Sequence, residues 1–163
     1  MTSQSLARQA EEFIERMGML GEAEGLPRIA GRVFGCLLLR PQPCTLEELA
    51  ETLGVSKASV STDARKLEQL GYLERNTRPG DRRDYYGISP DVFASSLRLR
   101  INRMREFHEL LVFAAGLPIR SVAVHERLEQ LETAYEVAVA ATVEVVESWQ
   151  LARTNVRARS ISA

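Results

Sequence analysis

Apolar residues recur at helical spacing near the start of the chain, in alternating steps of four and three: Leu6, Ala10, Phe13, Met17 and Leu20. This spacing places them on one face of an amphipathic helix. Gly21 and Gly25 are expected to end it. Pro27 suits the first turn of a second helix that runs toward Arg40, where two prolines follow. The pattern predicts two N-terminal helices separated by a short turn.

The next segment has the signals of two short helices. Thr45 and Glu48 form a Thr-x-x-Glu capping box, and Gly54 suits the left-handed residue that ends a helix. Ser56 is a capping residue for another helix, which Gly71 ends. The inward face of that second helix is Val60, Ala64, Leu67 and Leu70. Two short helices joined by a glycine-containing turn predict a helix-turn-helix.

After these helices the hydrophobic period changes from helical to extended. Tyr72–Arg75 and Tyr85–Ile88 are expected to be short strands, because they are rich in tyrosine, leucine and isoleucine. Between them lies Arg78-Pro79-Gly80-Asp81, with proline and glycine at the central positions that a type II turn prefers. The segment therefore predicts a two-stranded β-hairpin, or wing.

Helical spacing returns after the hairpin. Ser89-Pro90-Asp91 is typical of a helix start, and Gly116 and Pro118 interrupt the helix that follows. A last long helix has an apolar seam at Val124, Leu128, Leu131, Tyr135, Ala138, Thr142, Val145 and Trp149. This seam predicts packing against another helix along its length. The expected fold is mainly α: a winged helix-turn-helix at residues 26–89, an N-terminal helix at 1–25 and a helical region at 90–163.

Composition narrows the class of protein. The chain has 45% hydrophobic residues and 26% charged residues, as soluble globular proteins do. Its longest apolar run, Val33–Leu39, is far shorter than a membrane-spanning helix. No secretory signal is visible, so we expect a cytoplasmic protein in which Cys36 and Cys44 are reduced. Cys36 is expected in the core and Cys44 in a more exposed loop, and packing is favoured over a redox role for the pair.

The placement of charge favours DNA binding although the net charge is −1. Residues 56–83 contain seven basic and four acidic residues, a local positive excess. On the second helix the polar face offers small hydroxyls that allow approach to base edges, with lysine and arginine for phosphates or guanine. The expected contacts there are Ser56, Lys57, Ser59, Ser61, Thr62, Arg65 and Lys66. Asp63 fits less well; it either pairs with an arginine or contacts a cytosine amino group.

The predicted wing has arginines at its tip: Arg78, Arg82 and Arg83. A narrow hairpin can enter the minor groove, where negative potential attracts guanidinium groups. A solvated surface explains a lone charge run equally well. It does not explain a capped helix-turn-helix, a hydroxyl-rich face and an arginine-tipped turn in this order.

At these residues the sequence resembles the MarR family of winged-helix transcription factors, and its GbsR-like branch in particular. The resemblance rests on the segments 46–61, 67–75 and 80–86, within residues 26–90. It implies a homodimer in which the N-terminal helix and the C-terminal region of both subunits interlock. It also implies that Arg82 or Arg83 reaches the minor groove while Asp81 holds the wing in shape. Members of the family often respond to small molecules, so a small-molecule effector is a further possible partner.

Two other classes of function account for part of this pattern. A winged-helix module that binds only proteins is mildly favoured by the acidic total and by Asp63, but it would be expected to expose aromatic or aliphatic anchors. An enzyme is disfavoured, because no nucleophile with an evident base and no phosphate-binding loop is present. His108 and His125 are far apart without ligands at metal-binding offsets, so we expect no metal and no cofactor. His108 is interpreted as a packed or interface histidine.

The chain also contains aromatic residues at helical spacing that could surround an effector: Phe13, Phe107, Phe113, Tyr135 and Trp149. Ordinary core packing is the favoured interpretation of such residues.

Overall fold

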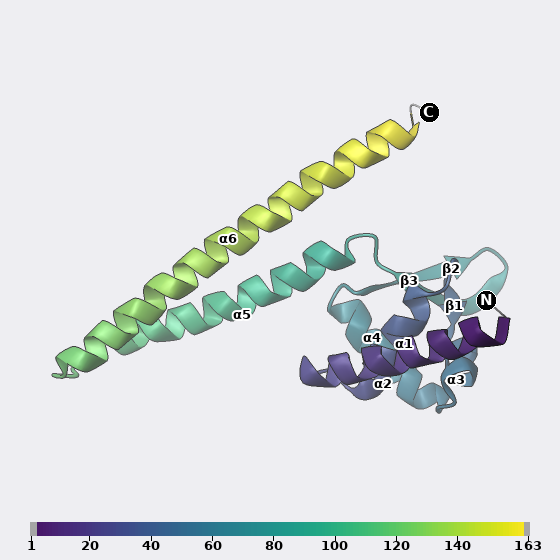
Figure 1. Ribbon diagram of the computed structural model, residues 1–163, viewed down its shortest axis with the longest axis horizontal. Coiled ribbons are helices and arrows are strands. Elements are labelled where there is room, and N and C mark those ends of the chain that lie inside the picture. Colours follow the sequence, from purple (N-terminus) through teal and green to yellow (C-terminus); the bar gives the residue numbers. More distant parts are fainter. Residues whose placement is uncertain (1–2, 162–163) are drawn as a thin grey trace. The chain divides into compact units, whose positions relative to one another are not determined.

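The computed structural model describes the backbone of residues 3–161 and the side chains of residues 4–154 (Figure 1). The chain forms two compact units, of which the first ends at Val92 and the second begins at Phe93. The first unit contains α1 (Ser3–Ala23), α2 (Arg28–Leu38), β1 (Cys44–Thr45), α3 (Leu46–Leu53), α4 (Lys57–Gln69), β2 (Leu73–Arg78) and β3 (Asp81–Ile88). The second unit is built from α5 (Val92–Ala115) and α6 (Val122–Ile161). The expected mainly α, winged helix-turn-helix fold is confirmed.

Glycines let α1 and α2 cross at close range. A Cβ atom at Gly31 would overlap the carbonyl oxygen of Met17 and lie 2.9 Å from the Cα of Gly18. Gly21 faces the same contact, since a Cβ there would lie 3.1 Å from the Cα of Gly31. The expectation that Gly21 ends the first helix is therefore wrong. It is an interior residue that permits close packing, and α1 continues to Ala23.

The helix-turn-helix follows the predicted local signals. The backbone N–H of Thr45 donates to Glu48 Oε2 at 2.7 Å, and the N–H of Glu48 donates to Thr45 Oγ1 at 3.3 Å, which confirms the capping box. Gly54 has a φ of +63°, the left-handed conformation expected there. The fully buried core side chains beneath these helices include Val33, Leu49, Val60 and Leu67.

The sheet has one strand more than the predicted hairpin. Its order is β1-β3-β2, and the two-residue strand β1 pairs antiparallel with β3, with Cys44 opposite Tyr86 and Thr45 opposite Tyr85. Cys44 is accordingly 3% exposed, so its expected place in an exposed loop is wrong. Burial raises the pKa of its thiol to about 11, which disfavours the reactive thiolate. Cys36 lies in the core as expected.

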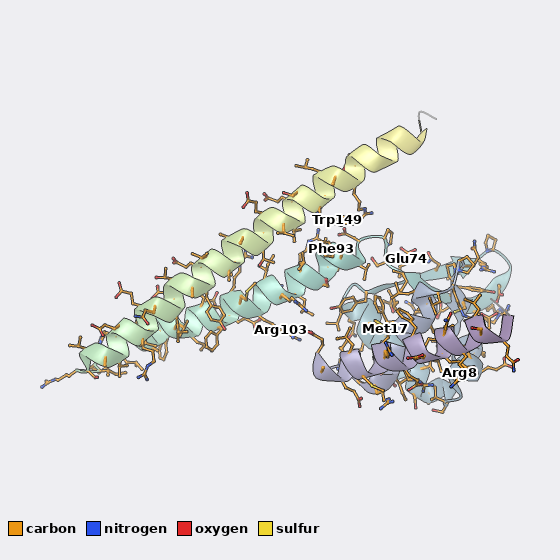
Figure 2. The ribbon with its side chains drawn as sticks, viewed as in Figure 1. Arg8, Met17, Glu74, Phe93, Arg103 and Trp149 are labelled. Atoms are coloured by element: carbon orange, nitrogen blue, oxygen red, sulfur yellow. The ribbon has the colours of Figure 1, made fainter. Side chains whose placement is uncertain are left out.

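The second unit is held by apolar contacts between α5 and α6. Ala94, Ile101 and Val146 are buried together, with Val139 and Val143 packed against them. Two aromatic pairs also belong to this unit. The ring centroids of Phe107 and Tyr135 are 4.8 Å apart. Those of Phe93 and Trp149, which are labelled in Figure 2, are 5.1 Å apart.

The predicted seam of α6 is correct at most of its positions and wrong at Leu131 and Val145. Val124, Leu128, Tyr135, Ala138 and Thr142 are partly buried, whereas Leu131 is 39% exposed and Val145 is 50% exposed next to the buried Val146. Alternating steps of four and three average 3.5 residues per turn, while a straight α-helix has about 3.6. The inward face therefore moves on by one residue along the helix. None of the helices among the described residues is both long and apolar enough to span a membrane.

Candidate nucleic-acid interface

Helix α4 buries one face and exposes the other. Val60, Ala64 and Leu67 lie in the core, as expected. Ser56 caps the helix: its hydroxyl accepts from the N–H of Ser59 at 3.1 Å. The side chains of Lys57, Thr62, Arg65 and Lys66 are exposed, and those of Ser59 and Ser61 are half-buried. The helix thus presents a polar face with free backbone donors at its N-terminus, where a phosphate group can bind.

Some side chains of this polar face are held by neighbours. Arg65 donates from Nε to the carbonyl oxygen of Ser61 at 3.1 Å and from a terminal nitrogen to Ser61 Oγ at 2.9 Å. Lys57 forms an ion pair with Glu47 of α3, which the sequence analysis does not anticipate. The side chain of Lys66 has no hydrogen bond or ion pair within the part of the chain that the structure describes, and it interacts with Asp63 only through their opposite charges. The polar face therefore combines a positioned arginine with a lysine that is free to reach a phosphate.

Asp63 does not belong to the polar face. Its side chain is on the buried side of α4 and is only 7% exposed, so neither an arginine pair nor a cytosine contact describes it. Burial raises the pKa of its carboxyl group, because removal from water penalises the charged form. Among the residues described, the carboxylate has no hydrogen bond or ion pair. The acidic residue consequently does not oppose DNA at the exposed surface of α4.

Asp81 organises the wing next to its turn. It accepts from the backbone N–H of Arg83 at 2.9 Å, from the Arg83 guanidinium at 2.6 Å and from the hydroxyl of Tyr85 at 2.7 Å. The guanidinium of Arg83 holds the pKa of Asp81 well below its ordinary value, and the same pair raises the pKa of Arg83. The hydrogen bond to Asp81 raises the pKa of Tyr85. A carboxylate that holds its neighbours in this way fixes the strand at the point where the hairpin turns.

The three wing arginines have different surroundings. Arg78 stacks on the Tyr85 ring, with its Cζ 3.8 Å from the ring centroid, and donates to the carbonyl oxygen of Pro43 at 3.4 Å. Arg83 is bound to Asp81. Arg82 is exposed, and across the described chain its guanidinium has no hydrogen bond or ion pair. Among the three wing arginines, Arg82 is therefore the one from which DNA would not have to displace a hydrogen bond or ion pair with a described residue.

The structure brings the predicted site residues together in small groups: Ser56 with Ser59, Ser61 with Arg65, and Asp81 with Arg83. Within the described residues no hydrogen bond or ion pair joins the α4 group to the wing group. Tyr85 is the site residue that the sequence analysis misses. The alternate spacing of Asp81, Arg83 and Tyr85 is a signal for it in the sequence, although the pairing of β3 with β2 is irregular between Asp81 and Asp84.

A capped helix-turn-helix followed by an arginine-bearing hairpin defines a winged helix-turn-helix protein. The family model described as MarR family matches residues 24–84, and the chain belongs to the MarR family. It is similar to the crystal structure of a transcriptional regulator at 33% identity, with a TM-score of 0.75, over 88% of this chain and 99% of that one.

Two curated proteins are similar over part of their length. The HTH-type transcriptional regulator MmpR5 of Mycobacterium tuberculosis (strain ATCC 25618 / H37Rv) is 44% identical over 100 residues, which are 61% of this chain and 61% of MmpR5. The HTH-type transcriptional repressor GbsR of Bacillus subtilis (strain 168) is 32% identical over 69 residues, which are 42% of this chain and 38% of GbsR. The chain thus matches about three-fifths of MmpR5 and a smaller share of GbsR.

Proposed function

We propose that this protein is a sequence-specific, double-stranded-DNA-binding transcriptional regulator that acts in the cytoplasm as a homodimer on an inverted repeat. The observation that carries the proposal is the pairing of two surfaces in one unit: the polar face of α4 and the wing with its unpaired Arg82. The names of the similar proteins MmpR5 and GbsR, a transcriptional regulator and a transcriptional repressor, support it.

In this proposal α4 enters the major groove. Its half-buried and exposed hydroxyls are small enough for the helix to approach base edges. Arg65, already oriented by Ser61, is the candidate for a guanine edge, whereas Lys57 and Lys66 bind phosphates. Ser56 fixes the N-terminus of the helix, whose backbone donors bind a further phosphate.

The wing enters the adjacent minor groove. Arg82 is the inserted side chain, because binding DNA costs it no existing partner within the described chain. Arg78 lies on the Tyr85 ring at the side of the hairpin and binds the phosphate backbone. Asp81 and Arg83 hold the strand that presents Arg82, so they act on DNA binding through the shape of the wing.

Dimerisation supplies the second half-site. Large apolar side chains in α1, α5 and α6 are exposed in the isolated chain: Leu6, Met19, Leu110, Phe113, Val137 and Leu151. We propose that the N-terminal helix and the two helices of the second unit bury these residues against a second copy. A symmetric dimer presents two α4 helices about 34 Å apart, one turn of DNA, and so selects an inverted repeat.

The two other functions have less support. The buried position of Asp63 removes one of the observations that favoured a protein-binding module, because this carboxylate is not on the exposed face of α4. The two surfaces described above contain no group of residues arranged for catalysis, so they give an enzymatic function no support. DNA binding accounts for both surfaces at once.

The test is selection from random duplexes, followed by sequencing, at two salt concentrations. We expect enrichment of an inverted repeat whose half-sites are about one helical turn apart. Arg65→Ala should weaken binding by about 1–3 kcal/mol and relax the preference at one base position. Arg82→Ala should weaken binding to all sequences and reduce the salt slope by about one.

The matched control is Arg103→Ala, which removes an exposed arginine from α5 (Figure 2) and should leave the selected sequence and the affinity unchanged. Weak, unenriched binding that modest salt abolishes would contradict the proposal, as would normal binding by both interface variants. The enriched duplex also serves to screen small-molecule effectors, since an effector would release it.

A further inference from the structure

Three side chains that are typical metal ligands converge in the second unit. His108 lies on α5, and Glu132 and Glu136 lie one turn apart on α6. One ligand atom from each of the three lies within 4.8 Å of the others. The Nε2 atom of His108 is 3.5 Å from Oε1 of Glu136.

This convergence is unfavourable without a cation. The Nε2 atom of His108 is removed from water and has no hydrogen-bond partner, so its interaction capacity is unmet. Glu132 and Glu136 are like charges at i and i+4, which destabilise a helix. A neutral imidazole nitrogen and two carboxylates all offer lone pairs to the same point, and a positive ion between them would satisfy all three.

The spacing suits a first-row divalent metal ion. Zinc binds histidine nitrogen and carboxylate oxygen at about 2.0–2.2 Å, which puts neighbouring ligands of a tetrahedral site about 3.3 Å apart. The separation of 3.5 Å between His108 and Glu136 is close to that value. Rotations of the exposed Glu136 side chain and of the Glu132 side chain would bring all three ligand atoms within bonding distance of one ion.

The cluster lies beside a cavity of about 480 Å³ formed by α5 and α6, which His108 and Glu136 border. Its other lining residues are Arg105, Val139, Ala140, Val143, Glu144 and Glu147, so three glutamates outnumber one arginine there and favour entry of a hydrated cation. Water from the cavity can fill the coordination positions that three protein ligands leave open.

We propose that His108, Glu132 and Glu136 bind one first-row divalent metal ion, for which Zn²⁺ is the reference, and that the ion joins α5 to α6. Imidazole favours zinc over the oxygen-preferring Mg²⁺. Sequence offsets miss this site because the histidine and the glutamates are on different helices and 24 or more residues apart. The site is independent of the DNA-binding surface.

The test uses the full chain without an affinity tag, freed of metal by a chelator and titrated with ZnCl₂ by calorimetry. We expect one bound Zn²⁺ per chain and a melting temperature that rises with zinc but not with the same concentration of Mg²⁺. His108→Gln and Glu136→Gln should each lower the affinity at least about tenfold, the loss that even an outer partner of a metal site produces. Glu126→Gln is the matched control, since it removes an exposed carboxylate from the same helix outside both the cluster and the cavity wall.

Nitrogen-detected NMR of the imidazoles gives a second readout in the unmodified protein. The chain has two histidines, so His108 is distinguished from His125 by one variant, His125→Gln. Zinc should shift the Nε2 resonance of His108 and leave His125 unchanged. The proposal is overturned if zinc produces neither heat nor a shift, which would leave only the direct contact between His108 and Glu136. It is also overturned if His108→Gln and Glu136→Gln bind zinc as the wild type does.

Discussion

Adjacent arginines in the wing have different partners at the point where the pairing of β3 with β2 becomes irregular, since Arg82 and Arg83 lie between the paired residues Asp81 and Asp84. Arg83 is bound to both Asp81 and Tyr85, whereas Arg82 has no such partner in the described chain. The resemblance to the family leaves both arginines as candidates for the minor groove. The hydrogen bonds of the structure favour Arg82.

The buried carboxylate of Asp63 leads to a prediction about stability. Asp63→Asn removes a charge that is desolvated and unpaired among the described residues, so it should raise the free energy of unfolding at pH 7 by about 1 kcal/mol. Burial raises the folded-state pKa, so the folded protein binds this proton more readily than the unfolded chain does. The wild type therefore loses stability as the pH rises through that window.

Urea denaturation at several pH values measures the effect. The advantage of Asp63→Asn should be full above the folded-state pKa and vanish as the pH falls below the ordinary value of 3.8. DNA affinity should not change, because Asp63 is not on the exposed face of α4. A large loss of affinity would instead restore a direct base contact for this residue.

Helix boundaries in the first unit depend on two kinds of information. The capping box of α3 and the left-handed Gly54 are local, and the sequence is sufficient to predict both. The end of α1 is not local, because Gly21 continues the helix only where α2 crosses it. The strand β1 is likewise missed, since two residues have no periodicity and their pairing partner is far along the chain.

The glycine contact between α1 and α2 predicts a graded loss of stability. A methyl group at Gly31 would press on the backbone of Met17 and Gly18, so Gly31→Ala should destabilise the protein by about 2 kcal/mol. Gly21→Ala meets Gly31 at 3.1 Å, a milder conflict, and gains about 1 kcal/mol of helix propensity. Its net effect should therefore be close to zero. Denaturant midpoints for the two variants should differ clearly, and equal midpoints would show that α1 can move away from α2 at no cost.

At the scale of the whole molecule, the proposed dimer depends on apolar side chains that the isolated chain leaves in water. Leu110 and Phe113 are 63% and 69% exposed on α5. Leu110→Glu or Phe113→Glu should dissociate the dimer, because a charge in an apolar interface has no compensating partner. Arg103→Glu, an exposed polar position on the same helix, is the control and should remain dimeric.

Sedimentation velocity measures the molecular mass of each variant, and circular dichroism establishes that the helices are intact. The dissociated variants should bind a single half-site weakly and lose the affinity for the inverted repeat. Variants that stay dimeric would place the interface elsewhere. The sequence indicates that the C-terminal helices pack along a seam, but it does not separate the residues of the α5–α6 contact from those left for a second copy, since both are apolar.

The glycine-mediated crossing of α1 and α2 has a mechanical consequence. Side chains between helices can rotate and absorb a small displacement, whereas backbone pressed against backbone cannot, so α1 and α2 move as one stiff body. Helix α2 in turn packs on α4 in the same core. A displacement of α1, for instance on binding of a second copy to its exposed apolar side, is therefore transmitted through α2 to α4, the helix that we propose binds DNA.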